Sequence, residues 1–275
     1  MAQLNTNIRG MNISYSLLNE TGSETIVFLH GFTGSAKTWE PIMEQLPGDC
    51  CCIAVDLLGH GNSDTPNDPN RYHMKEQLVD LHQLFISLKV TDFTLVGYSM
   101  GGRIALAYAL AYPDQVTSLV LESASPGLKT IEEQHVRIAA DDKLAERIEK
   151  DGLESFIDFW QDIPLFDSQK KLPELQLKNI RMERLQHSPE GLSNSLRGIG
   201  TGRQPSYWSA LEQLKLPVTL ITGEYDHKFN KIAEEMKNSI ENCEHIQVSD
   251  VGHAIHVENP VQFATIIKEQ LKSYI

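Results

Sequence analysis

A serine stands between two glycines, Gly97 and Gly101, where a buried-strand pattern gives way to one of the most apolar helical patterns of the chain. Glycines weaken the start of a helix, so a purely structural turn would not favour them here. The pattern G-x-S-x-G between a strand and a helix is typical of a sharp turn that exposes a nucleophilic serine. We therefore predict that Ser99 is catalytic. The backbone N–H of Met100, which begins the helix, is the predicted donor to an oxyanion.

A catalytic serine needs a base that takes its proton and an acid that orients the base. In the chain order that accompanies this turn, the acid and then the histidine follow the serine. We predict Asp226 as the acid, because it comes first beyond a strand pattern, and His253 as the base, because Gly252 gives it a turn. The same segments contain rivals for both roles: Glu224 and Asp250 for the acid, and His256 for the base.

A second oxyanion donor is expected in the loop after the third strand, where the chain reads HGFTGS. The backbone N–H of Phe32 is the predicted donor. Gly31 would let that backbone approach the site, and His30 would anchor the loop through hydrogen bonds. Together these assignments require the ends of several strands to meet at one rim of a sheet.

The rest of the chain supplies such strands. Short apolar runs typical of buried strands occur at residues 25–31, 51–59, 92–99, 116–123, 216–226 and 244–250. Helical patterns lie between them at residues 38–45, 74–88, 100–112, 230–239 and 260–274, and the alternating N-terminal stretch indicates an edge hairpin. Strand–helix alternation predicts an α/β fold, a mostly parallel sheet with helices on both faces.

The alternation is interrupted once. Between residues 126 and 205 the chain shows amphipathic helical stretches and no convincing strand. We interpret residues 126–205 as a helical cap over the carboxyl ends of the strands, where open α/β sheets bind ligands. Residues 1–125 and 206–275 would then form the core domain.

The composition excludes several kinds of protein. The 275 residues include 24 basic and 37 acidic side chains, and the net charge of −13 argues against binding to nucleic acid or to an anionic membrane. An anionic ligand would therefore need locally concentrated arginines. The longest apolar run has nine residues, whereas a bilayer-spanning helix needs about 20. Since the N-terminus also lacks a signal pattern, we expect a cytoplasmic protein. The cysteines lack metal-binding spacing, and no metal site is predicted.

The segments HGFTGS, DLLGHGNSD, GYSMGGR, GEYD and GHAIHVENP together resemble those of the α/β-hydrolase superfamily over essentially the full chain. The segments SASPGL, FWQDIPLF and GLSNSLRGIGTGRQPSYW are similar to those of a narrower family, the 2-succinyl-6-hydroxy-2,4-cyclohexadiene-1-carboxylate synthases of menaquinone biosynthesis. This resemblance implies a lyase that eliminates pyruvate from 2-succinyl-5-enolpyruvyl-6-hydroxy-3-cyclohexene-1-carboxylate. It also implies that Ser99 acts as a general base and that neither a metal nor an organic cofactor takes part.

The same resemblance implies which side chains bind the substrate, which carries three carboxylates. They are Arg103, Arg137, Arg184, Tyr98 and Trp160. Arginine suits this role because its guanidinium binds carboxylates bidentately. Arg103 follows Ser99 by one helical turn and can point into the same pocket. The chain departs from several relatives at Gln134, where they carry an arginine.

Two other functions would use the same residues. A serine hydrolase that cleaves an ester, or a C–C bond next to a ketone, needs the same triad, and a noncatalytic small-molecule receptor can retain it. The three arginines favour an anionic substrate over an apolar ester. We expect a small-molecule tricarboxylate as the partner, and a monomer or a weak homo-oligomer.

Overall fold

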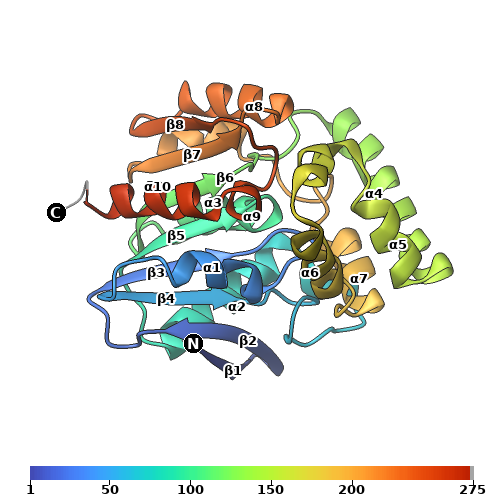
Figure 1. Cartoon of the computed structure of the whole chain (residues 1–275), viewed down its shortest axis with the longest axis horizontal. Coiled ribbons are helices and arrows are strands. Elements are labelled where there is room, and N and C mark those ends of the chain that lie inside the picture. Colours follow the sequence, from blue (N-terminus) through green and yellow to red (C-terminus); the bar gives the residue numbers. More distant parts are fainter. Residues whose placement is uncertain (273–275) are drawn as a thin grey trace.

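The computed structural model describes residues 1–272, in which eight strands form one sheet (Figure 1). Their order is β1-β2-β4-β3-β5-β6-β7-β8. Strand β2 is antiparallel to β1 and β4, and every other neighbouring pair is parallel, so the predicted mostly parallel sheet is confirmed. The strands are β1 (Ala2–Ile8), β2 (Met11–Leu18), β3 (Glu24–Leu29), β4 (Cys50–Val55), β5 (Phe93–Tyr98), β6 (Val116–Glu122), β7 (Val218–Gly223) and β8 (Cys243–Val248).

The central strands bury both of their faces. Along β3, Val27 and Leu29 point into one hydrophobic layer, and Ile26 and Phe28 point into the other. Successive side chains of a strand point to opposite faces, so a strand covered on both faces needs apolar residues at every position. This is why these strands appear in the sequence as unbroken apolar runs.

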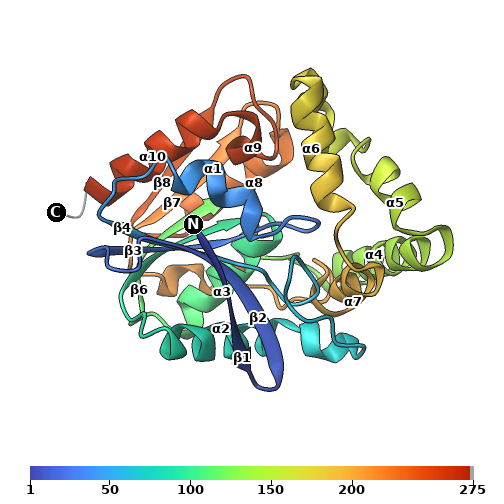
Figure 2. The same cartoon turned by 60° about the horizontal axis from the view of Figure 1, so that its bottom comes forward.

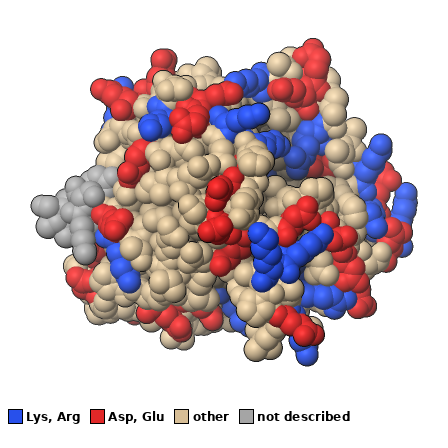
Figure 3. All heavy atoms as spheres, turned by 45° about the horizontal axis from the view of Figure 1, so that its top comes forward, with Lys and Arg blue, Asp and Glu red and all other residues tan. Residues whose placement is uncertain are grey.

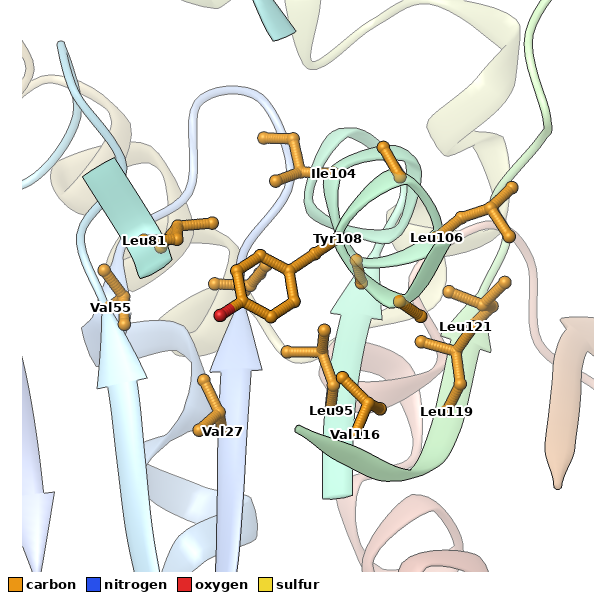
Figure 4. Packing of buried hydrophobic residues seen from close by; sticks show 14 of the residues in the cluster. Val27, Val55, Leu81, Leu95, Ile104, Leu106, Tyr108, Val116, Leu119 and Leu121 are labelled. Atoms are coloured by element: carbon orange, nitrogen blue, oxygen red, sulfur yellow. The ribbon is translucent and has the colours of Figure 1, made fainter. Parts of the chain in front are cut away.

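Helices cover both faces of the sheet, as predicted. One layer contains residues of α2 (Met74–Ser87), α3 (Met100–Ala111) and α8 (His227–Lys237). The other contains residues of α1 (Glu40–Met43) and α10 (Pro260–Lys272), which lie on the opposite side of the sheet in Figure 2. In Figure 4, Tyr108 of α3 lies over the strands among Val27 and Leu95, and its hydroxyl donates to Oε1 of Gln115 at 2.6 Å.

Between β6 and β7 the described chain contains helices and no strand. The main helices are α4 (Ile131–Asp151), α5 (Leu153–Trp160), α6 (Glu174–Arg184) and α7 (Pro189–Ile199), which lie together beside one end of the sheet (Figures 1 and 2). Helices α4, α5 and α7 share a small hydrophobic cluster, which includes Ile148, Phe156 and Leu192. We call this segment the helical insertion. Its treatment as a separate cap with boundaries at residues 126 and 205 stays a prediction.

Short helices complete the chain. They are α9 (Ile255–Glu258) and the 3₁₀ helices η1 (Ala36–Trp39), η2 (Pro69–Tyr72), η3 (Pro164–Lys171) and η4 (Trp208–Gln213). Within residues 1–272, no helix is both long and apolar enough to cross a bilayer.

Two predicted helices differ by several residues from the observed ones. The helix expected at residues 38–45 is divided into η1 and the four-residue α1, with Pro41 in the first turn of α1. Helix α8 begins at His227 and not at residue 230, because Asp226 caps its first turn by accepting from the N–H of Phe229. The last two residues of the predicted helix 260–274 lie outside the described residues.

Candidate active site

The turn around Ser99 explains its glycines. Ser99 joins β5 to α3 with φ 49° and ψ −104°, a strained backbone conformation for a residue with a side chain. A Cβ atom at Gly97 would lie 2.6 Å from the carbonyl oxygen of Gly101, and one at Gly101 would lie 2.2 Å from that of Leu29. Because neither position has room for a side chain, the two glycines make the serine turn possible.

The serine, histidine and acid selected from the sequence meet at the carboxyl ends of three strands. The Nε2 atom of His253 lies 3.1 Å from Oγ of Ser99, and its Nδ1 atom lies 2.5 Å from Oδ2 of Asp226. Both the histidine and the acid are buried. In this arrangement, Asp226 holds the imidazole so that Nε2 faces the serine, which is the geometry that activates a serine hydroxyl.

The rival residues lie elsewhere. Glu224 is exposed and accepts a hydrogen bond from the N–H of Asp250, whose carboxylate in turn accepts one from the hydroxyl of Tyr225. His256 is buried against Glu122, with 2.7 Å between Nδ1 and Oε2. Neither rival acid bonds to His253, so the geometry favours Asp226 and His253.

The two predicted oxyanion donors belong to residues that line the same cavity as Ser99. Met100 is the first residue of α3, so its N–H has no acceptor four residues back in the helix. The loop of Phe32 is anchored by His30, whose Nε2 accepts from the N–H of Leu57 at 3.1 Å. Gly31 is required there, since a Cβ atom would lie 2.5 Å from the Tyr98 ring.

The cavity above Ser99 has a volume of about 180 Å³. Residues that follow five strands line it from below, and residues of α4, α5 and α7 line it from the insertion. This is the edge at which open α/β sheets bind ligands. On the face drawn in Figure 3, lysine and arginine atoms border a hollow, although the protein is acidic overall.

Arg103 is the most deeply buried cation of this cavity, with 8% of its surface exposed. Its Nη2 donates to the carbonyl oxygen of Ile199 at 2.9 Å, and its Nη1 donates to Oε1 of Gln204. Burial, and then the charge of nearby Arg137, lower the Arg103 pKa to about 10. The two acceptors are neutral, so the guanidinium charge is not balanced by a bonded carboxylate within residues 1–272. A buried charge of this kind favours binding of an anion.

Arg137 and Trp160 line the same cavity from the insertion, and Tyr98 lines it from the end of β5. The Nε atom of Arg137 donates to Oδ1 of the buried Asp141 at 2.7 Å. Trp160 contacts Phe32, with 5.4 Å between ring centroids. The structure thus brings four of the predicted substrate-binding side chains to one cavity, and their role in binding stays a prediction: Arg103, Arg137, Tyr98 and Trp160.

Arg184 does not line that cavity. It lies at a second, smaller cavity of about 60 Å³, where its guanidinium carbon is 5.0 Å from the centroid of the Phe166 ring. Phe32, Tyr98 and Phe166 line both cavities and form the wall between them. Burial lowers the Arg184 pKa. The three arginines are thus divided between two neighbouring cavities, which helical spacing could not reveal.

Lys228 also lines the first cavity and was missed in the sequence. One feature of the sequence could have identified it: Lys228 follows Asp226 by two residues and lies at the start of the helix that comes after β7. Lys228 thereby adds a third cation to the lining of the cavity that already includes Arg103 and Arg137.

Three buried histidines join the Phe32 loop to the insertion. The ring of His60 lies 5.1 Å from that of His30 and 5.5 Å from that of His187. His187, which follows α6, donates from Nε2 to the carbonyl of Thr33 at 2.9 Å and accepts at Nδ1 from the N–H of Gly61. Burial lowers the pKa of all three rings, and that of His187 to about 4. In this neutral form the cluster connects the core to the insertion.

We expect acid to destabilise the protein through His187. Its pKa is about 4 when folded against 6.5 as a free side chain, so the unfolded chain takes up the proton first as the pH falls. The free energy of unfolding should therefore fall between these two pH values by about 3 kcal/mol from this group. Urea titrations across that window should show a smaller loss for His187→Asn than for the wild type. The exposed His73→Asn should behave like the wild type, and equal losses in all three proteins would contradict the prediction.

The fold and the buried Ser–His–Asp constellation define a class, the α/β hydrolases. The sequence profile described as the alpha/beta hydrolase fold matches residues 24–260. Over 263 residues the chain is 46% identical to the Bacillus subtilis (strain 168) protein named "Putative 2-succinyl-6-hydroxy-2,4-cyclohexadiene-1-carboxylate synthase", covering 95% of this chain and 96% of that protein. It is 31% identical over 251 residues to the Enterobacter sp. (strain 638) 2-succinyl-6-hydroxy-2,4-cyclohexadiene-1-carboxylate synthase, covering 91% and 93%.

The solved structure of MenH from S. aureus superimposes with a TM-score of 0.90 at 37% identity, covering 94% of this chain and 98% of that one. The chain belongs to the α/β-hydrolase fold family and, within it, to the family of 2-succinyl-6-hydroxy-2,4-cyclohexadiene-1-carboxylate synthases. The fold and the enzyme family predicted from the sequence are confirmed.

Proposed function

We propose that this protein eliminates pyruvate from 2-succinyl-5-enolpyruvyl-6-hydroxy-3-cyclohexene-1-carboxylate and releases 2-succinyl-6-hydroxy-2,4-cyclohexadiene-1-carboxylate, a carbon–oxygen lyase step of menaquinone biosynthesis. The observation that carries the proposal is one juxtaposition. A triad serine and an arginine without a bonded carboxylate, Ser99 and Arg103, face the same cavity. An apolar ester would not require such a buried cation, whereas a substrate with three carboxylates does.

The triad supplies the base. Asp226 orients His253, which accepts the hydroxyl proton of Ser99 through the 3.1 Å contact. The Ser99 oxygen then removes the ring proton next to the succinyl ketone. As the C–H bond breaks, negative charge develops on the ketone oxygen, where the N–H groups of Phe32 and Met100 stabilise it. No acyl-enzyme forms in this sequence.

Collapse of the enolate completes the elimination. Its electrons pass through the ring alkene and break the C–O bond to the enolpyruvyl group. The departing enolate takes the proton held by the triad and becomes pyruvate. The sum is one substrate giving one diene and one pyruvate, with no water consumed and no external oxidant or reductant. We assign no metal and no organic cofactor to these steps.

Different cations would bind different carboxylates of the substrate. Arg103, Arg137 and Lys228 would bind carboxylates in the first cavity, and Arg184 would bind one across the aromatic wall. Anchoring the carboxylates at separate points fixes the ring proton over Ser99, which contributes to the rate by restricting orientation. Tyr98 and Trp160 supply apolar contact for the ring. We further propose that the protein acts in the cytoplasm as a monomer or a weak homo-oligomer.

The proposal is tested by incubating the protein with freshly generated substrate. Pyruvate release and the growth of conjugated-diene absorbance should rise together with one-to-one stoichiometry. A protein that leaves this substrate unchanged yet hydrolyses a simple aryl ester through Ser99 would be a serine hydrolase, and the proposed elimination would be wrong. A protein that binds the substrate without turnover would be a receptor.

A further inference from the structure

A second buried carboxylate–histidine pair lies beside the triad, and the steps above do not use it. Glu122 ends β6 with 0% of its surface exposed. Its carboxylate accepts the backbone N–H of His256 at 3.0 Å and the ring Nδ1–H at 2.7 Å. The His256 ring is held between Trp39, at 4.5 Å between ring centroids, and Tyr98, at 4.6 Å.

Glu122 also bonds to the serine turn. The backbone N–H of Ser99 donates to the carbonyl oxygen of Glu122 at 2.8 Å. His256 lies three residues after His253 in the same short stretch, residues 252–258, which we call the histidine segment. Glu122 therefore bonds to the serine turn through its main-chain carbonyl and to the histidine segment through its carboxylate.

The histidine segment also has other anchors, among them the bond from the Gln176 amide to the carbonyl of Val257 and the buried side chain of Ile255. At its start, the N–H of Gly252 donates to Oε2 of Glu258 at 2.9 Å, and at its middle His253 bonds to Asp226. The Tyr98 ring fills the space between the two histidines, with centroids 5.4 Å from His253 and 4.6 Å from His256. The Glu122 bonds differ from these contacts because they tie the segment to the same residue that holds the backbone of Ser99.

We propose that Glu122 and His256 are positioning residues that set the separation between Ser99 Oγ and His253 Nε2. Neither residue lines the cavity that contains Ser99. His256 does line the second cavity, where Arg184 lies, but its Nδ1 is bonded to Glu122, and we assign its effect to the triad. A buried carboxylate is costly unless its hydrogen bonds are complete, so removing one partner leaves the other unpaired and lets the segment shift. A displacement of about 1 Å in reacting groups can cost about a hundredfold in rate.

The test compares His256→Ala and Glu122→Ala with the conservative variants His256→Asn and Glu122→Gln. The amide of asparagine can donate in place of Nδ1, and glutamine retains an acceptor oxygen. Two rates are measured: kcat and KM for pyruvate release, and the rate at which a fluorophosphonate phosphonylates Ser99. The second rate reports activation of Ser99 by His253 and needs no knowledge of the substrate.

Both alanine variants should lose about tenfold to a hundredfold in kcat and in labelling rate, with KM changed by less than about twofold. The conservative variants should recover most of that loss. The double alanine variant should be no worse than either single one, because the two side chains act as a unit. Leu121→Ala is the matched control: this neighbour in β6 is equally buried but packs on the opposite face of the sheet. It should lower the Tm and leave both rates near those of the wild type.

Alanine variants that lower the Tm as Leu121→Ala does, but keep both rates within about twofold, would overturn the proposal. If they fail to fold, His256→Asn is decisive: near-wild-type rates support positioning by the donated bond, and a loss as large as that of His253→Ala contradicts it. A wild type that is labelled at Ser99 but releases no pyruvate would refute the proposed function alone, and the labelling rates would still test this pair.

Discussion

Ser99→Ala is expected to lower kcat for pyruvate release by about 10²- to 10⁴-fold, the size of a general-base contribution. The variant removes the oxygen that takes the ring proton. It leaves the two oxyanion N–H groups and the arginines in place, so KM should change little. Some turnover above the uncatalysed rate should remain, because binding and electrostatic stabilisation persist without the triad.

Two comparisons make this result specific. His253→Ala should cost about as much as Ser99→Ala, and the double variant should be no slower than either, since the triad acts as a unit. Ser193→Ala is the matched control, because this serine is also buried but its hydroxyl donates to the carbonyl of Glu190 in α7. A Ser99→Ala protein that keeps kcat within about tenfold of the wild type would exclude Ser99 as the base.

The role of Ser99 as base or nucleophile has its own readout. Mass spectrometry of the wild type, quenched during turnover, should show no covalent adduct, because the proposed elimination passes through no acyl-enzyme. An adduct on Ser99 that forms and decays at the turnover rate would assign it as a nucleophile and contradict the general-base mechanism.

Arg103→Met is expected to raise KM for the substrate by about tenfold to a hundredfold, the equivalent of one charge-assisted hydrogen bond to a carboxylate. The side chain is buried and its two protein acceptors are neutral, so its charge is available to the substrate. Methionine retains much of the volume and removes the charge. The bonds to Ile199 and Gln204 are lost as well, so the Tm should be recorded for each variant.

The steady-state constants of three variants test this expectation. Arg103→Lys keeps the charge without the planar fork and should fall between the wild type and Arg103→Met. Arg181→Met is the matched control, because Arg181 forms ion pairs with Glu154 and Asp158 on the insertion surface and lines neither cavity. If Arg103→Met binds the substrate as tightly as Arg181→Met does, Arg103 is not a carboxylate ligand.

Much of the fold could be predicted because its signals are local. Strands covered on both faces appear as continuous apolar runs, as in β3 and β4, and the insertion appears as a long stretch without such runs. The serine turn could also be predicted. Its glycines are required because a side chain there would clash with atoms within a few residues or on the adjacent strand. The start of α8 was predicted less well. The helix begins after Asp226, which caps its first turn, and such a polar cap is not detected by a search for apolar periodicity.

The candidate site could be predicted only in part from the sequence. The sequence analysis preferred His253 to its rival His256 only because Gly252 precedes it, and no distance to Ser99 supported that choice. Glu122 distinguishes the two histidines in space, because its carboxylate accepts a hydrogen bond from the His256 ring. Glu122 lies on a strand 134 residues away from His256 in the sequence. The division of the arginines between two cavities depends in the same way on where Phe32, Tyr98 and Phe166 meet.

By itself, the sequence determined the strands, the serine turn, the order of the triad residues and the family, since each depends on residue types at short spacings or in recognisable segments. The tertiary structure alone decided which histidine faces Ser99, which arginines share its cavity, and that Lys228 joins them. The physical reason is that these relations arise between strand ends and helices that are distant in the chain. Packing brings them together, and no local periodicity encodes the distances between them.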